Sequence, residues 1–189
     1  IRLKVVLSVI YLMFNEGYNS SESKNLIRED LIEQALFLCK AILDHPKTKL
    51  AEVYALMALM CFHLARANSR VGVEGNLILL KNQDRSKWNL EWIQVGRNYL
   101  RQSGFGDRIS EYHFEAFIAY EHCQAKDFKS TNWQVIYDSY EKLLKLKFDP
   151  VVYLNQCLVL MELKSSKVSL VALKKISGHK TMKKYYLYY

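Results

Sequence analysis

The sequence predicts an all-α fold of stacked antiparallel helix pairs, with one short β-hairpin inserted between helices. Apolar residues recur at helical spacing over most of the 189-residue chain. Only two prolines and seven glycines occur, and most of them stand where the apolar pattern breaks. Breaking residues this sparse indicate helices joined by short turns. In one place the pattern changes to strict alternation, which is typical of a strand pair.

The first two predicted helices are amphipathic and cover residues 3–16 and 27–44. In the first helix Val6, Ile10, Met13 and Phe14 recur at helical spacing, and Gly17 ends the pattern. The second helix begins with acidic residues, which suit the positive end of the helix dipole, and a proline stops it. Its predicted buried stripe is Leu31, Ala35, Leu38 and Ile42.

The third predicted helix, residues 50–66, is apolar on nearly every side. A helix with that pattern is expected at the centre of the fold, covered by its neighbours. Beyond it, apolar residues alternate across residues 71–79 around a Gly-Asn pair, which predicts the β-hairpin. A polar run then leads into the next helix, with Asn89 as its predicted N-cap.

Five further helices complete the prediction. They cover residues 90–102, 110–126, 132–146, 149–163 and 168–176. Ser110 is a capping candidate, and Asp149-Pro150 places a proline in the first turn of its helix. Apolar positions near residue 144 are echoed near residue 176, a spacing close to the roughly 34 residues of a tetratricopeptide unit.

These elements predict two parts. Residues 1–130 form a helical lobe with the hairpin near 70–80, and residues 131–189 form tetratricopeptide-like helix pairs that are cut short at the end. In that architecture each helix pair needs a stacked neighbour to cover its apolar face. The chain begins and ends abruptly, as expected of a piece of a longer protein.

The net charge of +8 belongs mainly to the end of the chain. Residues 163–189 hold seven lysines and no acid, whereas residues 1–162 hold 20 basic and 19 acidic side chains. An excess made only of lysine favours a solvated face, with a DNA contact as the alternative. The longest strongly apolar stretch is too short to span a bilayer, so no membrane association is expected.

Nothing in the sequence has the pattern of a catalytic or metal centre. No HExxH, GxSxG or phosphate-loop motif occurs, and we expect no enzyme, no metal and no cofactor. His63 and His122 lie in apolar helical patterns and are interpreted as core histidines. The cysteines lack ligand spacing and are interpreted as small buried hydrophobes in a reducing compartment. They are Cys39, Cys61, Cys123 and Cys157.

A group of polar residues from separate segments is predicted to meet at one end of the bundle. Arg66 and Arg70 share a helix face, and the hairpin returns the chain so that Asp84 can accept a bidentate bond from either. Two interpretations stay open: a structural network that clips the hairpin to the helix ends, or a groove for an acidic peptide or small anion. The group is Asn15, Glu16, Arg66, Arg70, Asp84, Arg85 and Trp88.

Three segments carry a combined signature: YLMFNEGY at residues 11–18, QDRSKW at 83–88 and PVVYLN at 150–155. In this order they resemble the YLxFNEGY, QDRSxW and PVVxLN segments of sigma factors that carry a tetratricopeptide-like C-terminal extension, the extracytoplasmic-function group called the ECF42 type. Residues 28–31 and 58–70 resemble that family's RxDL and ALM…AR…R segments. The resemblance adds Gln83 and Asn155 to the candidate residues.

The resemblance implies a cytoplasmic role in transcription initiation for a regulatory domain of a bacterial sigma factor. Its implied partners are proteins: the sigma regions of the same protein, core RNA polymerase or a regulator. The parent protein would bind promoter DNA through regions outside this segment. The chain departs from the family pattern at Ala67, Asn132 and Gln156, where arginine, aspartate and arginine are usual.

Two alternatives remain beside this interpretation. One is a free-standing tetratricopeptide-like adaptor unrelated to transcription. The other is a small-ligand receptor built on Arg66, Arg70 and Asp84.

Overall fold

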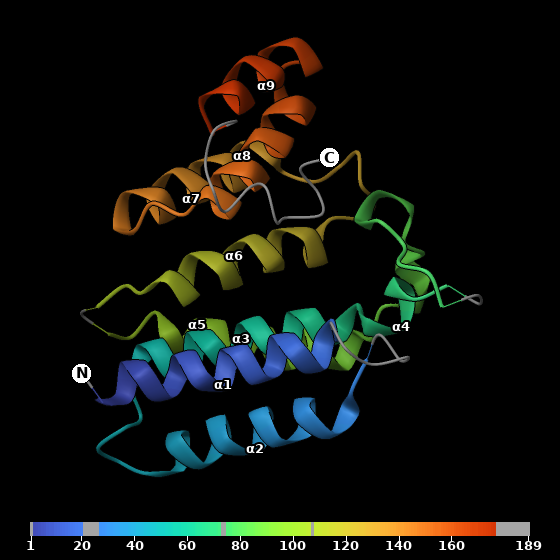
Figure 1. Ribbon diagram of the computed structural model, residues 1–189. Helices are drawn as coiled ribbons and strands as arrows, with labels where there is room; N and C mark the ends of the chain where they lie inside the picture. Colours follow the sequence, from blue (N-terminus) through green and yellow to red (C-terminus); the bar gives the residue numbers. More distant parts are fainter. Residues whose placement is uncertain (1, 21–26, 73–74, 107, 177–189) are drawn as a thin grey trace.

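The computed structural model describes residues 2–20, 27–72, 75–106 and 108–176, and over these residues it is helical without a β-strand (Figure 1). The all-α prediction is therefore confirmed. The elements are α1 (Arg2–Tyr18), α2 (Glu29–Asp44), α3 (Ala51–Ala65), α4 (Ala67–Arg70), η1 (Leu80–Asn82), η2 (Arg85–Lys87), α5 (Leu90–Ser103), α6 (Glu111–Gln124), α7 (Trp133–Leu146), α8 (Pro150–Leu163), α9 (Ser166–Leu173) and η3 (Lys174–Ile176).

The capping residues act where the sequence placed them. The Asn89 side chain accepts from the Trp92 amide at 3.0 Å at the start of α5. The Asp149 carboxylate accepts from the Val151 amide at 2.7 Å at the start of α8. Each side chain satisfies one of the amides that a helix start leaves without a partner, so these two boundaries were readable from the sequence.

The predicted hairpin region contains a tight turn. One isolated antiparallel bridge joins Val71 to Leu77, and the Gly72 amide donates to the Asn76 carbonyl oxygen at 2.8 Å. Gly75 takes a φ of 77°, which a side chain would disfavour. Residues 73–74 lie outside the described residues. The chain reverses here as expected, and the described residues on either side form a single bridge.

Helix α3 occupies the centre of the N-terminal part, as its pattern predicts. Its side chains are buried nearly all round, and it packs against α1, α2, α5 and α6. The contact with α5 is close at Gly96, where a Cβ would come within 2.7 Å of the buried Phe62 ring. A glycine inside an otherwise regular helix is explained by this approach, because any side chain there would displace the ring.

The predicted stripe of α2 is confirmed at Ala35 and displaced by one residue at its other positions. Its buried positions are Ile32, Ala35, Cys39 and Leu43, whereas the predicted Leu38 is 41% exposed. In α1, likewise, Leu7 is buried and the predicted Val6 is exposed. Both helices carry two adjoining apolar stripes, and periodicity alone cannot select between stripes that differ by one position.

The core is unequal along the chain. One large cluster joins α1, α2, α3 and α6 with Trp88, and partly buried side chains of α5 pack against it. Beyond it, α6, α7, α8 and α9 pack in chain order around two small clusters (Figure 1). The first of these is Ile118, Ile136 and Val159, and the second is Leu154 and Ile176. The predicted unfinished helix at the end lies outside the described residues.

All four cysteines are free and buried, as predicted. No helix in the described part of the chain is both long and apolar enough to cross a membrane.

Candidate functional site

Three helices end side by side next to the segment that connects α4 to α5 (Figure 1). They are α1, α3 and α6, which end at Tyr18, Ala65 and Gln124. The last carbonyl groups of each helix have no partner within that helix, and the helix dipole gives this end a partial negative charge. The fold therefore brings three weakly negative helix ends to one place.

Arg70 serves the end of α1. Its Nη1 donates to the Tyr18 carbonyl oxygen at 2.7 Å, and its guanidinium lies 3.8 Å from the centre of the Tyr18 ring. One side chain thus bonds the last carbonyl of a helix and stacks on the aromatic ring of the same residue.

Arg85 serves the end of α6. Its Nη1 donates to the carbonyl oxygens of His122 at 2.5 Å and Ala125 at 2.8 Å. Its guanidinium lies 4.5 Å from the centre of the buried Trp88 ring. Burial, followed by the neighbouring Arg66, lowers the pKa of Arg85 from its ordinary value, and an arginine still stays charged at neutral pH.

Arg66 lies at the end of α3 and holds the connecting segment. Its Nε donates to the Gln83 side-chain oxygen at 3.4 Å, and its guanidinium lies 5.5 Å from the Trp88 ring centre. Gln83 is buried and in turn donates to the Ile78 carbonyl oxygen at 3.0 Å. We call Arg66, Arg70 and Arg85 the helix-end arginines. Arg66 and Arg85 join residues that follow the turn to the ends of α3 and α6, and Arg70, which precedes the turn, bonds the end of α1.

The predicted pairing of Asp84 with Arg66 or Arg70 is wrong. Asp84 is exposed, and no ion pair joins it to either arginine, although all three residues are described. Its carboxylate accepts instead from the amide and hydroxyl of Ser86, at 3.0 and 2.6 Å, and these bonds lower its pKa. The carboxylate caps the short helix η2, while backbone carbonyls take its predicted place beside the arginines. A ligand site that uses Asp84 together with the arginines therefore has no geometric basis.

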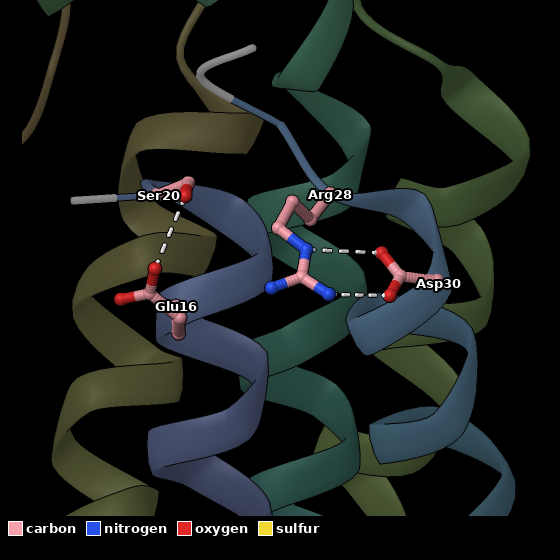
Figure 2. A network of polar contacts seen from close by, with 4 residues as sticks. All are labelled: Glu16, Ser20, Arg28 and Asp30. Atoms are coloured by element: carbon pink, nitrogen blue, oxygen red, sulfur yellow. Dashed lines mark hydrogen bonds and ion pairs between the residues drawn. The ribbon is translucent and has the colours of Figure 1, made fainter. Parts of the chain in front are cut away.

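The other predicted residues lie around the cluster or away from it. Glu16, on α1, accepts from the Ser20 hydroxyl at 3.1 Å, near the exposed fork in which Arg28 pairs with Asp30 at 2.7 Å (Figure 2). Asn15 is exposed on the same helix. Asn155 is half-buried in α8, a helix that packs against α7 and α9, so the structure does not bring it to the helix-end arginines.

Two histidines border the cluster as neutral groups. Burial, followed by the charges of Arg66 and Arg70, lowers the pKa of His63 to about 3. Burial, followed by Arg66 and Arg85, lowers the pKa of His122 to about 3. Within the described residues, no three His, Cys, Asp or Glu side chains are grouped so that they could hold a metal ion.

Several buried polar atoms of the cluster have no hydrogen-bond partner among the described residues. They are the Tyr18 hydroxyl, Arg85 Nη2, Trp88 Nε1 and His122 Nδ1. All four lie within or beside the contacts described above. Each helix-end arginine nevertheless donates to a carbonyl or amide oxygen and lies over an aromatic ring, so the geometry favours the structural interpretation over an open anion groove.

Sequence reasoning missed one half-buried titratable pair. The Tyr11 hydroxyl donates to Glu115 Oε2 at 2.6 Å across the contact between α1 and α6. Burial raises the pKa of Glu115 to about 7, and it also raises the pKa of Tyr11 well above its ordinary value. The only signal in the sequence is a glutamate on the apolar side of a helix, which does not reveal its partner.

Comparison with known proteins gives one family and one curated relative. Residues 2–104, more than half of the chain, match the family of unknown function DUF6596. The uncharacterized protein R00370 of Rhizobium meliloti (strain 1021) is 32% identical over 155 residues. That alignment covers 82% of this chain and 36% of the relative, so the chain spans about a third of the relative's length. No solved structure gives a significant match. On the extent of the family match, the chain belongs to DUF6596.

Proposed function

We propose that this chain is a regulatory, protein-binding extension of a bacterial sigma factor of the ECF42 type. The observation that carries the proposal is the packing of two signature segments into one cluster. YLMFNEGY supplies Tyr18, and QDRSKW supplies Arg85 and Trp88. The two segments lie far apart in the sequence and pack together in the structure. A shared fold would require both segments for this packing, and this supports the resemblance to that group.

We also propose that α6 to α9 stack in a tetratricopeptide-like manner and that the turn near residue 75 is the hairpin insertion of this group. The sequential packing of these helices supports the first point. The positive φ of Gly75 and the bridge from Val71 to Leu77 support the second. Stacked helix pairs expose long faces, and binding a partner is their usual use.

In this proposal the domain acts in the cytoplasm by binding and not by catalysis. Its partner is a protein: the sigma regions of the same chain, core RNA polymerase or a regulator. The promoter is read by other regions of the parent protein. The helix-end arginines keep the scaffold in one conformation, and the exposed helix faces make the contact.

The test compares the full-length parent protein with a version that lacks the segment equivalent to residues 2–176. Co-purification of core polymerase subunits and promoter-dependent transcription are measured for both. We expect the deletion to change at least one of the two by about tenfold or more, which corresponds to about 1.4 kcal/mol of coupling. Equal values for both proteins, or a parent that lacks sigma regions, would overturn the proposal.

A second measurement uses the isolated chain and promoter DNA. We expect no specific binding at moderate salt, because the segment contributes no promoter-reading element. Tight binding with a steep dependence on salt concentration would contradict this, since such a slope reports contacts to phosphates.

A further inference from the structure

A second set of basic residues lines a cleft on another face of the molecule. The cleft has a volume of about 680 Å³ and is lined by α5, the loop that follows α5, α6 and α7. We call its four basic residues the cleft cations. They are Arg97, Arg101, Arg108 and Lys142.

The cleft cations are exposed, and none of them has a carboxylate partner among the described residues. The described lining residues include no aspartate or glutamate, and none of the four makes an ion pair within the described part of the chain. Elsewhere in the described part of the chain, the exposed Arg28 pairs with Asp30 and the exposed Lys40 pairs with Asp44. Arg97 and Arg101 stand four residues apart on α5 and so project from the same helix face. A concave surface of one sign concentrates the field toward ligands of the opposite sign.

The wall of the cleft is held in place by satisfied polar groups. The Ser110 amide donates to His113 Nδ1 at 3.1 Å, so Nε2 carries the proton and is directed at the Ser103 carbonyl oxygen 3.2 Å away. Burial lowers the pKa of His113, so the ring ties α5 to α6 as a neutral group. The Ser139 hydroxyl donates to the Val135 carbonyl oxygen at 2.7 Å. These groups have partners already, whereas the cleft cations have no carboxylate partner among the described residues.

The cleft also offers apolar contacts. Phe114, Phe117 and Ile109 line it, with Phe117 36% and Ile109 63% exposed. Cations around a partly apolar floor fit a peptide that carries carboxylates beside an aliphatic or aromatic anchor. Single-stranded nucleic acid prefers a series of open aromatic faces, and in this cleft only Phe117 among the aromatic residues is more than a third exposed.

Charge also argues against the C-terminal residues of this chain as the occupant of the cleft. Residues 177–189 contain three lysines and no acid, so that segment is repelled by the cleft cations. An acidic segment from another protein has the opposite charge, and an apolar side chain on it can pack against the floor of the cleft.

We propose that this cleft binds an acidic peptide segment of a partner protein, with its carboxylates on Arg97, Arg101 and Lys142 and an apolar anchor against Phe117. The inference rests on the proposed function only in taking the domain to bind a protein. It adds the chemistry of the partner and the face that receives it.

The probes are short fluorescent peptides in which several glutamates flank a single leucine, phenylalanine or tryptophan. Matched peptides carry glutamine in place of each glutamate, and a single-stranded oligonucleotide of equal charge is the third probe. Binding to the full 189-residue chain is measured by fluorescence anisotropy. We expect at least one acidic peptide to bind about tenfold or more tightly than its glutamine counterpart, with an advantage that shrinks as salt is raised.

The variant Arg97→Glu/Arg101→Glu is expected to weaken acidic-peptide binding by about tenfold or more. The control Lys81→Glu/Lys87→Glu makes the same change in net charge at exposed positions outside the cleft, and it should stay within about twofold of the parent chain. Circular dichroism of both variants checks that the helices remain.

Four results would overturn the proposal: equal losses in both variants, tighter binding of the oligonucleotide than of any acidic peptide, no binding by any acidic peptide, or self-association that Arg97→Glu/Arg101→Glu abolishes. The last would make a second copy of the chain the occupant. Peptide binding with no effect of the domain on transcription would refute the proposed function and leave this inference standing. An effect of the domain on transcription without binding of any acidic peptide would refute this inference and leave the proposed function standing.

Discussion

The helix-end arginines and the cleft cations are the same kinds of side chain in opposite surroundings. Arg70 and Arg85 face carbonyl oxygens at helix ends and lie over aromatic rings. Arg97 and Arg101 are exposed beside a cleft, and neither has a carboxylate partner in the described part of the chain. Charge counting treats both sets alike, because each cation adds one to the net charge. What a basic residue does is decided by its partners: a cation that bonds carbonyl oxygens of its own chain holds the fold, and one without such bonds can bind a ligand.

The comparison also explains why the helix-end arginines need no carboxylate partner. A helix C-terminus provides several carbonyl oxygens and the negative end of a dipole, and a cation there gains both. The aromatic rings of Tyr18 and Trp88 add electron-rich faces. Three helix ends in one place therefore accommodate three guanidiniums that would otherwise repel one another.

The largest expected effect comes from Arg85→Ala. The change removes two hydrogen bonds to the end of α6 and the contact with Trp88. We expect the free energy of unfolding to fall by about 2–4 kcal/mol, because charge-assisted bonds to partly buried carbonyls are lost. Denaturant unfolding followed by circular dichroism measures this value.

The matched control is Arg101→Ala, an exposed arginine of the cleft. Its free energy of unfolding should stay within about 0.5 kcal/mol of the parent chain. Equal losses in Arg85→Ala and Arg101→Ala would break the distinction between the two sets.

Glu115 is an acidic residue that can be compared with the helix-end arginines. It is half-buried against Tyr11, and the charged groups that act on it most strongly, Glu111 and Asp149, are acids that raise its pKa further. A buried carboxyl without a cation takes up a proton, whereas the helix-end arginines stay charged. Its folded pKa of about 7 exceeds the ordinary 4.5, so the folded state binds more protons between these values.

The contribution of Glu115 to the free energy of unfolding should therefore be largest below about pH 4.5, and it should fall as pH rises toward about 7. We expect Glu115→Gln to remove about 2–3 kcal/mol of that pH dependence. Urea unfolding at a series of pH values measures it. The variant Glu91→Gln, an exposed glutamate on α5, should leave the profile unchanged. A profile for Glu115→Gln that follows the parent chain would show that another group titrates.

The order of the long helices could be predicted because periodicity, glycine, proline and capping residues report local preferences, whereas the predicted hairpin forms one isolated bridge among the described residues. The buried stripe of α2 could not, since Leu38 and Cys39 belong to adjoining apolar stripes and only packing chooses between them. The gathering of Arg66, Arg70, Arg85 and Trp88 was predictable in outline, because the turn returns the chain to the end of α3. Their partners were not, because backbone carbonyls leave no signal in a sequence.

Asp84 shows most directly that the position of a residue could be predicted and its partner could not. Its substitution has the smallest expected effect. The sequence suggested that it neutralises a buried arginine, in which case Asp84→Ala would strand a charge and unfold much of the domain. In the structure the exposed carboxylate caps only η2 through Ser86. We expect Asp84→Ala to shift the thermal midpoint by less than about 3 °C, as the loss of one short cap implies. Ser86→Ala should give a shift of similar size, because it removes the other half of the same contact. A much larger shift for Asp84→Ala alone would restore the carboxylate as a partner of the helix-end arginines and would mean that carbonyls alone do not stabilise them.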